Sequence, residues 1–150
     1  MEELTAGDPR ELAMENARRK ALAVPSPLTL GADTDVALDG EILGKPADAG
    51  QARDFLARLA GRDHLVVGGI ALAEDGALRD TAVEVTTVRF RALDEATIDW
   101  YAATGEWRGR AGGYAIQGAG AALIEAIEGD YLNVVGLPLA RLLDLRPELL

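Results

Sequence analysis

The segment HLVVGGIALAEDGALRDTAVEVTTVRFR, residues 64–91, carries the clearest structural pattern in this chain. Its first arm, His64 to Ala73, is almost continuously apolar, and the triplet Glu74-Asp75-Gly76 that follows is typical of a tight turn. Apolar runs and period-two alternation on the two sides of one turn predict a long antiparallel hairpin. The second arm, Ala77 to Arg91, alternates between two faces, one of which carries Val83, Val85, Thr87 and Arg89.

Two helices are predicted ahead of the hairpin from their capping residues. Asp8 is a good N-cap and is followed by proline, so the first helix is expected to run from Pro9 to about Ala23. Asp48 caps a second helix, which carries an apolar face and ends before Gly61. Helices therefore precede the hairpin at two places.

A buried strand and two more helices complete the expected elements. The short apolar run Leu28 to Ala32 predicts a strand that presents Asp33 at its C-terminal end. Asp94 caps a helix that stops at Gly105, and a last helix is expected to begin near Pro138. Strands and helices mixed in this order predict an α/β or α+β sheet domain.

Composition excludes several classes of protein. The chain has 150 residues, with 15 Lys and Arg against 25 Asp and Glu, and it contains no cysteine. A net charge of −10 repels a nucleic acid polymer at long range. The lack of cysteine restricts a metal site to oxygen ligands and fits a reducing compartment. Since no apolar run reaches the roughly 18 residues of a membrane span, we expect a cytoplasmic protein without a membrane partner.

Three segments contain residues able to carry chemistry. Asp33 and Asp35 at a strand end suit a catalytic acid or metal ligand, although on spacing alone an Asx-turn is the better interpretation. Lys45 lies in a turn restrained by Gly and Pro, which can present its ammonium to a phosphate. The glycine-rich stretch 110–120 contains Gln117, which can hydrogen-bond a planar ligand, but a flexible surface loop is the alternative.

Taken together, four segments resemble the Maf family in order and spacing. The resemblance implies an α/β fold related to inosine triphosphate pyrophosphatase, with a mixed sheet flanked by helices and two lobes around a cleft, in one domain over residues 1–150. It also implies a hydrolase acting on phosphoric anhydrides, which converts a nucleoside triphosphate to the monophosphate and pyrophosphate with a divalent metal, Mg²⁺ or Mn²⁺. The segments are GADT at 31–34, LDGEILGKP at 38–46, AGGYAIQG at 111–118 and NVVGLP at 133–138.

The resemblance assigns the catalytic and metal-binding roles to four residues. Asp33 is similar to the family's proton acceptor, which activates the attacking water, and Lys45 is similar to its phosphate-binding lysine. Glu3 or Glu2 matches the acidic residue that helps to hold the metal, together with Asp33. These carboxylates and the lysine are suited to a reaction that develops negative charge on phosphoryl oxygens.

The resemblance also assigns residues to substrate binding. Thr34 and Gln117 match the positions associated with the branch of the family that prefers dTTP and UTP. An amide can read the O4 and N3–H edge of uracil or thymine, since it both donates and accepts. Arg110 stands where the family usually has a lysine, and both residue types can contact phosphate. The expected partner is therefore a nucleoside triphosphate.

Two departures from the family pattern change what we expect. The family opens with a strand and a Ser-x-Ser-x-Arg-Arg loop that holds the triphosphate, and this stretch does not occur here. We therefore expect an N-terminally truncated domain that is less stable or prone to associate, and a homodimer is kept as an alternative to a monomer. Gly68 occupies a strand site usually held by threonine.

The alternative function is a catalytically inactive Maf-like domain that binds a nucleotide or a partner linked to septum formation and cell division.

Overall fold

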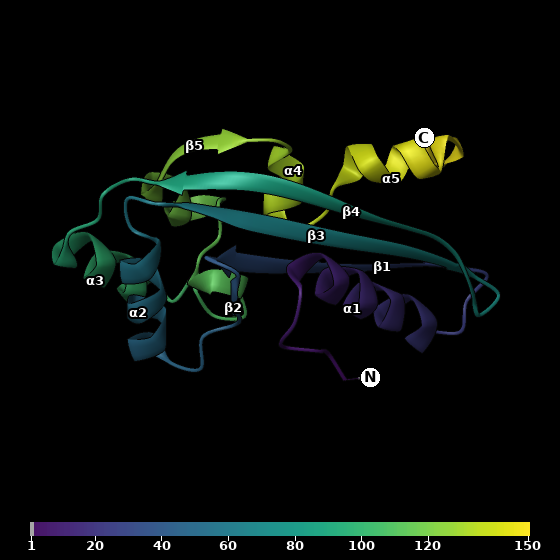
Figure 1. Cartoon of the computed structure of the whole chain (residues 1–150), viewed down its shortest axis with the longest axis horizontal. Coiled ribbons are helices and arrows are strands. Elements are labelled where there is room, and N and C mark those ends of the chain that lie inside the picture. The colour runs from purple at the N-terminus through teal and green to yellow at the C-terminus, as the bar shows by residue number, and fades with distance from the viewer. Residues whose placement is uncertain (1) are drawn as a thin grey trace.

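The computed structural model describes residues 2–150 as a five-stranded sheet with helices on both faces. The strands are β1 (Leu28–Leu38), β2 (Glu41–Leu43), β3 (Asp63–Glu74), β4 (Ala77–Phe90) and β5 (Ile124–Glu128), in the order β2-β1-β3-β4-β5. Every pairing between these strands is antiparallel. The sheet flanked by helices confirms the α/β class, and β3 and β4 form the predicted hairpin (Figure 1).

The helices begin where the capping residues predict. Helix α1 (Pro9–Ala23) has Asp8 as its N-cap, and the Asp8 carboxylate accepts hydrogen bonds from two backbone amides of the first turn. Asp48 and Asp94 cap α2 (Ala49–Leu59) and α3 (Glu95–Thr104) in the same way. After β5 come α4 (Tyr131–Val135), α5 (Leu139–Leu145) and a short 3-10 helix at Pro147–Leu149. Among residues 2–150, no helix is both long enough and apolar enough to cross a bilayer.

One prediction about β1 was wrong. The strand was expected to end before Asp33, but it continues to Leu38, and Asp33 pairs with Gly69 in the middle of the ladder with β3. The apolar run underestimates the length of this strand. The backbone groups of the polar residues that follow it are paired by the ladder, and their side chains are paired by contacts from a helix, so these residues do not need solvent. Asp33 therefore lies within the sheet and not beyond its end.

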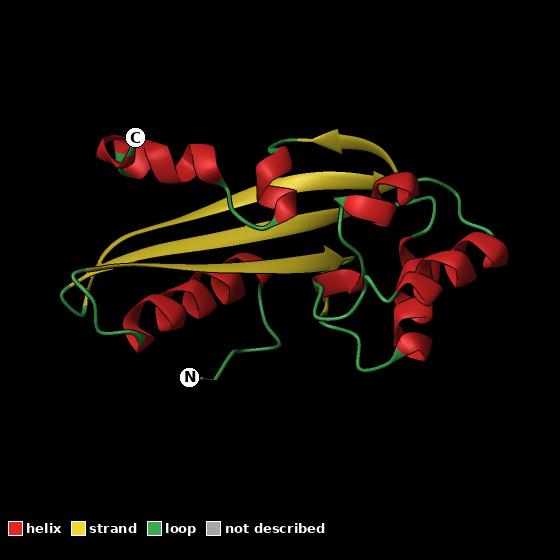
Figure 2. Cartoon of the chain, turned by 180° about the vertical axis from the view of Figure 1, so that it is seen from behind, coloured by secondary structure: helices red, strands yellow, loops and turns green. Residues whose placement is uncertain are grey.

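Two neighbouring glycines show which helix covers which face of the sheet. A Cβ built on Gly69 would meet the backbone of α1, whereas one built on Gly68 would meet Asn133 of α4. Because successive residues of a strand point to opposite faces, α1 covers one face and α4 covers the other. Figure 2 shows the same arrangement from behind, with the two helices separated by the three long strands.

The largest apolar cluster lies at one end of the sheet, where α2 and α3 pack (Figure 1). It includes Leu56 and Leu59 of α2, Tyr101 of α3, and Val66 and Phe90 of the hairpin, all of which are buried. Two smaller clusters lie under α1 and α5. The end of the sheet near α2 and α3 and the region under α1 and α5 are therefore packed around different apolar clusters. The middle of β1 lies between these two regions.

Strand β1 has an open edge that positions the site. Its outer neighbour β2 pairs only with Val36, Ala37 and Leu38. Within residues 2–150, the edge from Leu28 to Asp35 therefore has no partner strand. A ligand can approach this edge and reach side chains on both faces of the sheet.

Candidate active site

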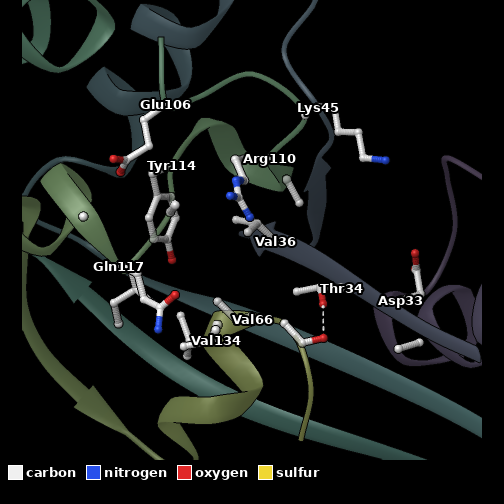
Figure 3. A pocket seen from close by; sticks show the side chains of 18 of the residues that line it. Asp33, Thr34, Val36, Lys45, Val66, Glu106, Arg110, Tyr114, Gln117 and Val134 are labelled. Atoms are coloured by element: carbon white, nitrogen blue, oxygen red, sulfur yellow. Dashed lines mark hydrogen bonds between the residues drawn. The ribbon is translucent and has the colours of Figure 1, made fainter. Parts of the chain in front are cut away.

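A cavity of about 420 Å³ lies against the open edge of β1 and collects residues from distant parts of the chain. Its walls come from α1, β1, the loop after β2, the loop after α3, and the segment that joins α4 to α5. Five of the residues expected from sequence line it together, namely Asp33, Thr34, Lys45, Arg110 and Gln117 (Figure 3).

Asp33 and Thr34 enter this cavity from opposite faces of β1. Asp33 faces α1, where its carboxylate accepts a hydrogen bond from Lys20 at 3.0 Å. Thr34 faces the other way and its hydroxyl donates to the carbonyl of Gly136, beyond α4, at 3.4 Å. Since adjacent strand residues point to opposite faces, one ligand can contact both side chains only by lying across the edge of β1.

The Asp33 end of the cavity is a compact group of charges. The Lys20 ammonium lies 2.9 Å from Glu3 and 3.0 Å from Asp33, and Lys45 lies 3.9 Å from the other Glu3 oxygen. Burial lowers the pKa of Lys20, but its hydrogen bonds to Glu3 and Asp33 raise that pKa by more, so it stays a cation. The hydrogen bond from Lys20 lowers the pKa of Glu3. Two carboxylates and two ammonium groups thus converge at one end.

Asn16 explains why Glu3 lies in this group. Its side-chain oxygen accepts from the backbone amide of Leu4 at 2.7 Å, and its amide donates to the carbonyl of Leu4 at 2.9 Å. The same amide lies 3.4 Å from Asp33. Asn16 is almost fully buried, and its contacts join the N-terminal segment to Asp33 in the middle of β1. The neighbouring Glu2 is exposed, and its backbone carbonyl accepts from Arg19.

The sequence prediction of the site missed Lys20 and Asn16. Asn16 lies on the buried stripe of α1 among apolar neighbours, and Lys20, four residues later on the same side of the helix, is half-buried. Polar residues on a buried stripe need partners. This requirement for partners was the signal in the sequence that could have identified Asn16 and Lys20. It does not indicate which residues the two side chains contact.

Asp35 lies two residues from Asp33 on the same face of β1. One of its carboxylate oxygens is buried without a hydrogen-bond partner among the described residues. Burial raises the pKa of Asp35 to about 7, and the negative charge of Asp33 adds to this. Asp35 is therefore a carboxyl group close to Asp33 that is partly protonated near neutral pH.

The charged end can accept a divalent cation that arrives with a phosphate ligand. Among residues 2–150, no three His, Asp or Glu side chains are arranged to hold a metal by themselves. Mg²⁺ in nucleotide sites is usually bound by one or two carboxylates together with phosphate oxygens. Glu3 and Asp33 already converge on one cationic nitrogen, so they are placed to act as a pair of that kind.

The other end of the cavity is more apolar. Val36, Val66 and Val134 form its floor, and Gln117 projects from the glycine-rich loop beside them (Figure 3). Arg110 and Tyr114 form the wall between Gln117 and Lys45. A flat, weakly polar group fits between these valines and the Gln117 amide.

The wall residue Tyr114 is held from behind. Its hydroxyl lies 2.6 Å from Nε2 of His64, and its ring packs edge to face against His64 and Phe90. Burial lowers the pKa of His64 to about 4, so the imidazole is neutral at pH 7. The hydrogen bond and the aromatic contacts keep Tyr114 at a fixed place beside the cavity.

The buried His64 should make stability depend on pH. Its pKa is about 6.5 in the unfolded chain and about 4 in the folded one, so the unfolded state binds the proton more readily. The stabilisation is complete above about pH 6.5 and is lost as the pH falls towards 4, by up to about 3 kcal/mol. Urea unfolding of the parent and of His64→Gln at pH 7.5 and pH 4.5 measures this loss as a change in their difference.

Comparing the parent with the variant isolates the contribution of His64 to the pH dependence of stability. Asp35 has the opposite sign, because its raised pKa favours the folded state at low pH and that stabilisation is lost as the pH rises through about 7. This contribution is common to both proteins and cancels. A free-energy difference that stays constant between the two pH values contradicts a neutral buried His64.

Comparisons with known proteins find related sequences over most of the chain. A protein-family model described as "Maf-like protein" matches residues 1–148. A dTTP/UTP pyrophosphatase of Pyrococcus furiosus is 50% identical over 136 residues, covering 88% of this chain and 71% of the relative. The dTTP/UTP pyrophosphatase of Symbiobacterium thermophilum is 52% identical over 140 residues, covering 91% and 72%. That of Pyrococcus abyssi is 45% identical over 148 residues, covering 96% and 79%.

Proposed function

Because the chain belongs to the Maf family, we propose that it is a nucleoside triphosphate pyrophosphatase that hydrolyses dTTP and UTP to the monophosphate and pyrophosphate. One observation supports this most directly. Asp33, Lys45, Arg110 and Gln117, which are far apart in the sequence, line a single cavity with Thr34 at the edge of β1. A cytoplasmic location, where such nucleotides are used, is part of the proposal.

The proposed substrate lies across the edge of β1. Its triphosphate is placed at the charged end with Lys20 and Lys45, and its base is placed at the valine-lined end beside Gln117. This orientation pairs phosphate with ammonium groups and leaves the flat base against apolar side chains. Thr34 keeps its hydroxyl bonded to Gly136 and so limits the width of the passage between the two ends.

In the proposed reaction, Asp33 acts as the general base. A water oxygen forms a bond to the α-phosphorus, its proton passes to Asp33, and the bond to the oxygen that bridges the β-phosphorus breaks. Pyrophosphate leaves with the electron pair of that bond. Lys20 and Lys45 stabilise the charge that develops on the phosphoryl oxygens and on the leaving group.

Relatives in this family are metal-dependent, and the two carboxylates suit such a role. Mg²⁺ or Mn²⁺ carried by the nucleotide would be held by Glu3 and Asp33, would offset phosphate charge and would lower the pKa of the attacking water. Lys20 now bridges these carboxylates, so it would turn towards the phosphates when the divalent cation is present.

Gln117 is proposed to donate to and accept from the edge of uracil or thymine.

The reaction is tested by incubating the chain with dTTP, UTP, CTP or GTP in ¹⁸O-labelled water, with Mg²⁺ or Mn²⁺. We expect pyrophosphate from dTTP and UTP at rates well above those for CTP and GTP. Attack at the α-phosphorus places the label in the monophosphate, whereas attack at the β-phosphorus places it in the pyrophosphate. Nucleotide binding without release of pyrophosphate would instead favour a catalytically inactive binding domain.

A further inference from the structure

A single carboxylate organises the loop that carries Gln117. The loop of residues 115–120, called here the 115–120 loop, has three backbone amides that donate towards the end of α3. Ala119 and Gly120 donate to the two oxygens of Glu106 at 3.1 and 2.9 Å. Ala115 donates to the hydroxyl of Tyr101 at 3.0 Å, and that hydroxyl donates to Glu106 at 2.9 Å.

These contacts hold the loop on both sides of Gln117. One lies two residues before it and the others lie two and three residues after it. Hydrogen bonds from backbone amides to a charged carboxylate are stronger than those between neutral groups. Gln117 itself makes no part of this network, and its side chain is exposed and turned to the cavity (Figure 3).

The loop closes tightly around the carboxylate, and glycine is needed for this. Gly118 has φ +73°, and a Cβ on it would lie 2.6 Å from a Glu106 oxygen. A Cβ on Gly120 would lie 1.7 Å from the carbonyl of Ala115. The glycine-rich composition therefore serves a compact turn around Glu106 rather than a flexible surface loop.

Glu106 is in turn held by the C-terminal end of α3. Its backbone amide donates to the hydroxyl of Thr104 at 3.1 Å, and that hydroxyl donates to the carbonyl of Tyr101 at 2.6 Å. The neighbouring Trp107 is buried and its indole donates to the carbonyl of Ala102 at 2.9 Å. The position of the carboxylate is thus set by a helix, and the loop takes its position from the carboxylate.

We propose that Glu106, with Tyr101, is a positioning residue that sets nucleobase selectivity by holding Gln117 in place at the base end of the cavity. The inference rests on the proposed function and adds to it a residue that need not touch the base. Glu106 lies on the side of the cavity away from Asp33 and Lys45 (Figure 3). Loss of this support should therefore change base discrimination and leave triphosphate binding unchanged.

The principal variant is Glu106→Gln, which keeps the shape but replaces one acceptor oxygen by a donor. One of the two loop amides then faces an NH₂ group and loses its partner. We expect the ratio of kcat/KM for UTP to that for CTP to fall about tenfold or more. The kcat for UTP and the inhibition constant of inorganic tripolyphosphate, which has no base, are expected to change less than about threefold.

A second variant keeps the test independent of one side chain. Tyr101→Phe removes the hydroxyl that accepts from Ala115 and donates to Glu106, so it should lower the same ratio. The effects of the two changes should be less than additive in the double variant, because both act on one network. Glu125→Gln removes a negative charge at an exposed site of β5 and serves as the matched control.

The outcomes separate the inference from the proposed function. A folded Glu106→Gln with unchanged discrimination, or one that loses tripolyphosphate inhibition to the same extent, overturns the inference. A parent chain that binds UTP no better than CTP also overturns it. A parent that binds UTP selectively without hydrolysing it contradicts the proposed reaction, and the binding ratio of UTP to CTP then replaces kcat/KM in the same comparison.

Discussion

Replacing Asp33 with Asn is expected to lower kcat for dTTP at least about a hundredfold, because general-base catalysis is worth roughly 10² to 10⁴ in rate. The amide has the size of the carboxylate but cannot take the proton of the attacking water. It is also a poorer ligand for a divalent cation. Pyrophosphate release under saturating dTTP measures the change.

The fold of the Asp33→Asn protein should survive, so the loss can be assigned to chemistry. Lys20 keeps its ion pair with Glu3, and the amide can still accept its hydrogen bond. Removing the charge also removes the repulsion between Asp33 and Asp35. A shift in thermal midpoint on adding dTTP shows whether the nucleotide still binds.

A matched change elsewhere provides the control for Asp33. Asp99→Asn removes the same charge from an exposed site on α3, where the carboxylate pairs with Arg53. Its kcat is expected to stay within about twofold of that of the parent, since exposed ion pairs contribute little to the stability of the fold. If Asp33→Asn keeps a kcat within about threefold of the parent, Asp33 is not the base.

The second large effect concerns stability. Gly69→Ala is expected to lower the free energy of unfolding by about 3 kcal/mol, the upper part of the range for overpacking a core. A Cβ at this position would lie 2.3 Å from the carbonyl oxygen of Ala13 and 2.8 Å from the amide of Met14. Both contacts are with helix backbone, so no side chain can rotate to make room and α1 must lift from the sheet.

Lifting α1 would also disturb the candidate active site. The helix carries Lys20 and Asn16, which contact Asp33 from one side. A Cβ on Gly31 would meet the same helix, 2.0 Å from the carbonyl of Ala17, so α1 approaches the sheet closely at two places. Gly69→Ala should therefore lose activity along with stability. Nucleotide binding, which stabilises the folded state, should recover part of both.

Gly44→Ala is the matched control for the glycine test. No atom would lie within 4 Å of the added methyl group, and Gly44 is not in the positive-φ region. Its free energy of unfolding, measured by urea titration, is expected to stay within about 0.5 kcal/mol of the parent. If Gly69→Ala is as stable as Gly44→Ala, close packing of α1 on β3 is not what stabilises the fold.

The sequence by itself determined the longer helices and the hairpin, and it picked out five residues that line the cavity. The helix starts at Asp8, Asp48 and Asp94 were predicted correctly, because a capping carboxylate bonds amides only two or three residues away. The hairpin was predicted correctly, because alternation and a turn are also local signals. The resemblance in four segments selected Asp33, Lys45 and Gln117 before any geometry was known.

Only the tertiary structure decided how these residues meet. Asp33 and Thr34 are adjacent in sequence yet lie on opposite faces of β1, and they share a cavity only because the edge of that strand is open. Lys20 reaches Asp33 because two glycines let α1 lie against the sheet. Contacts of this kind depend on the docking of elements many residues apart, which local propensity and spacing do not encode.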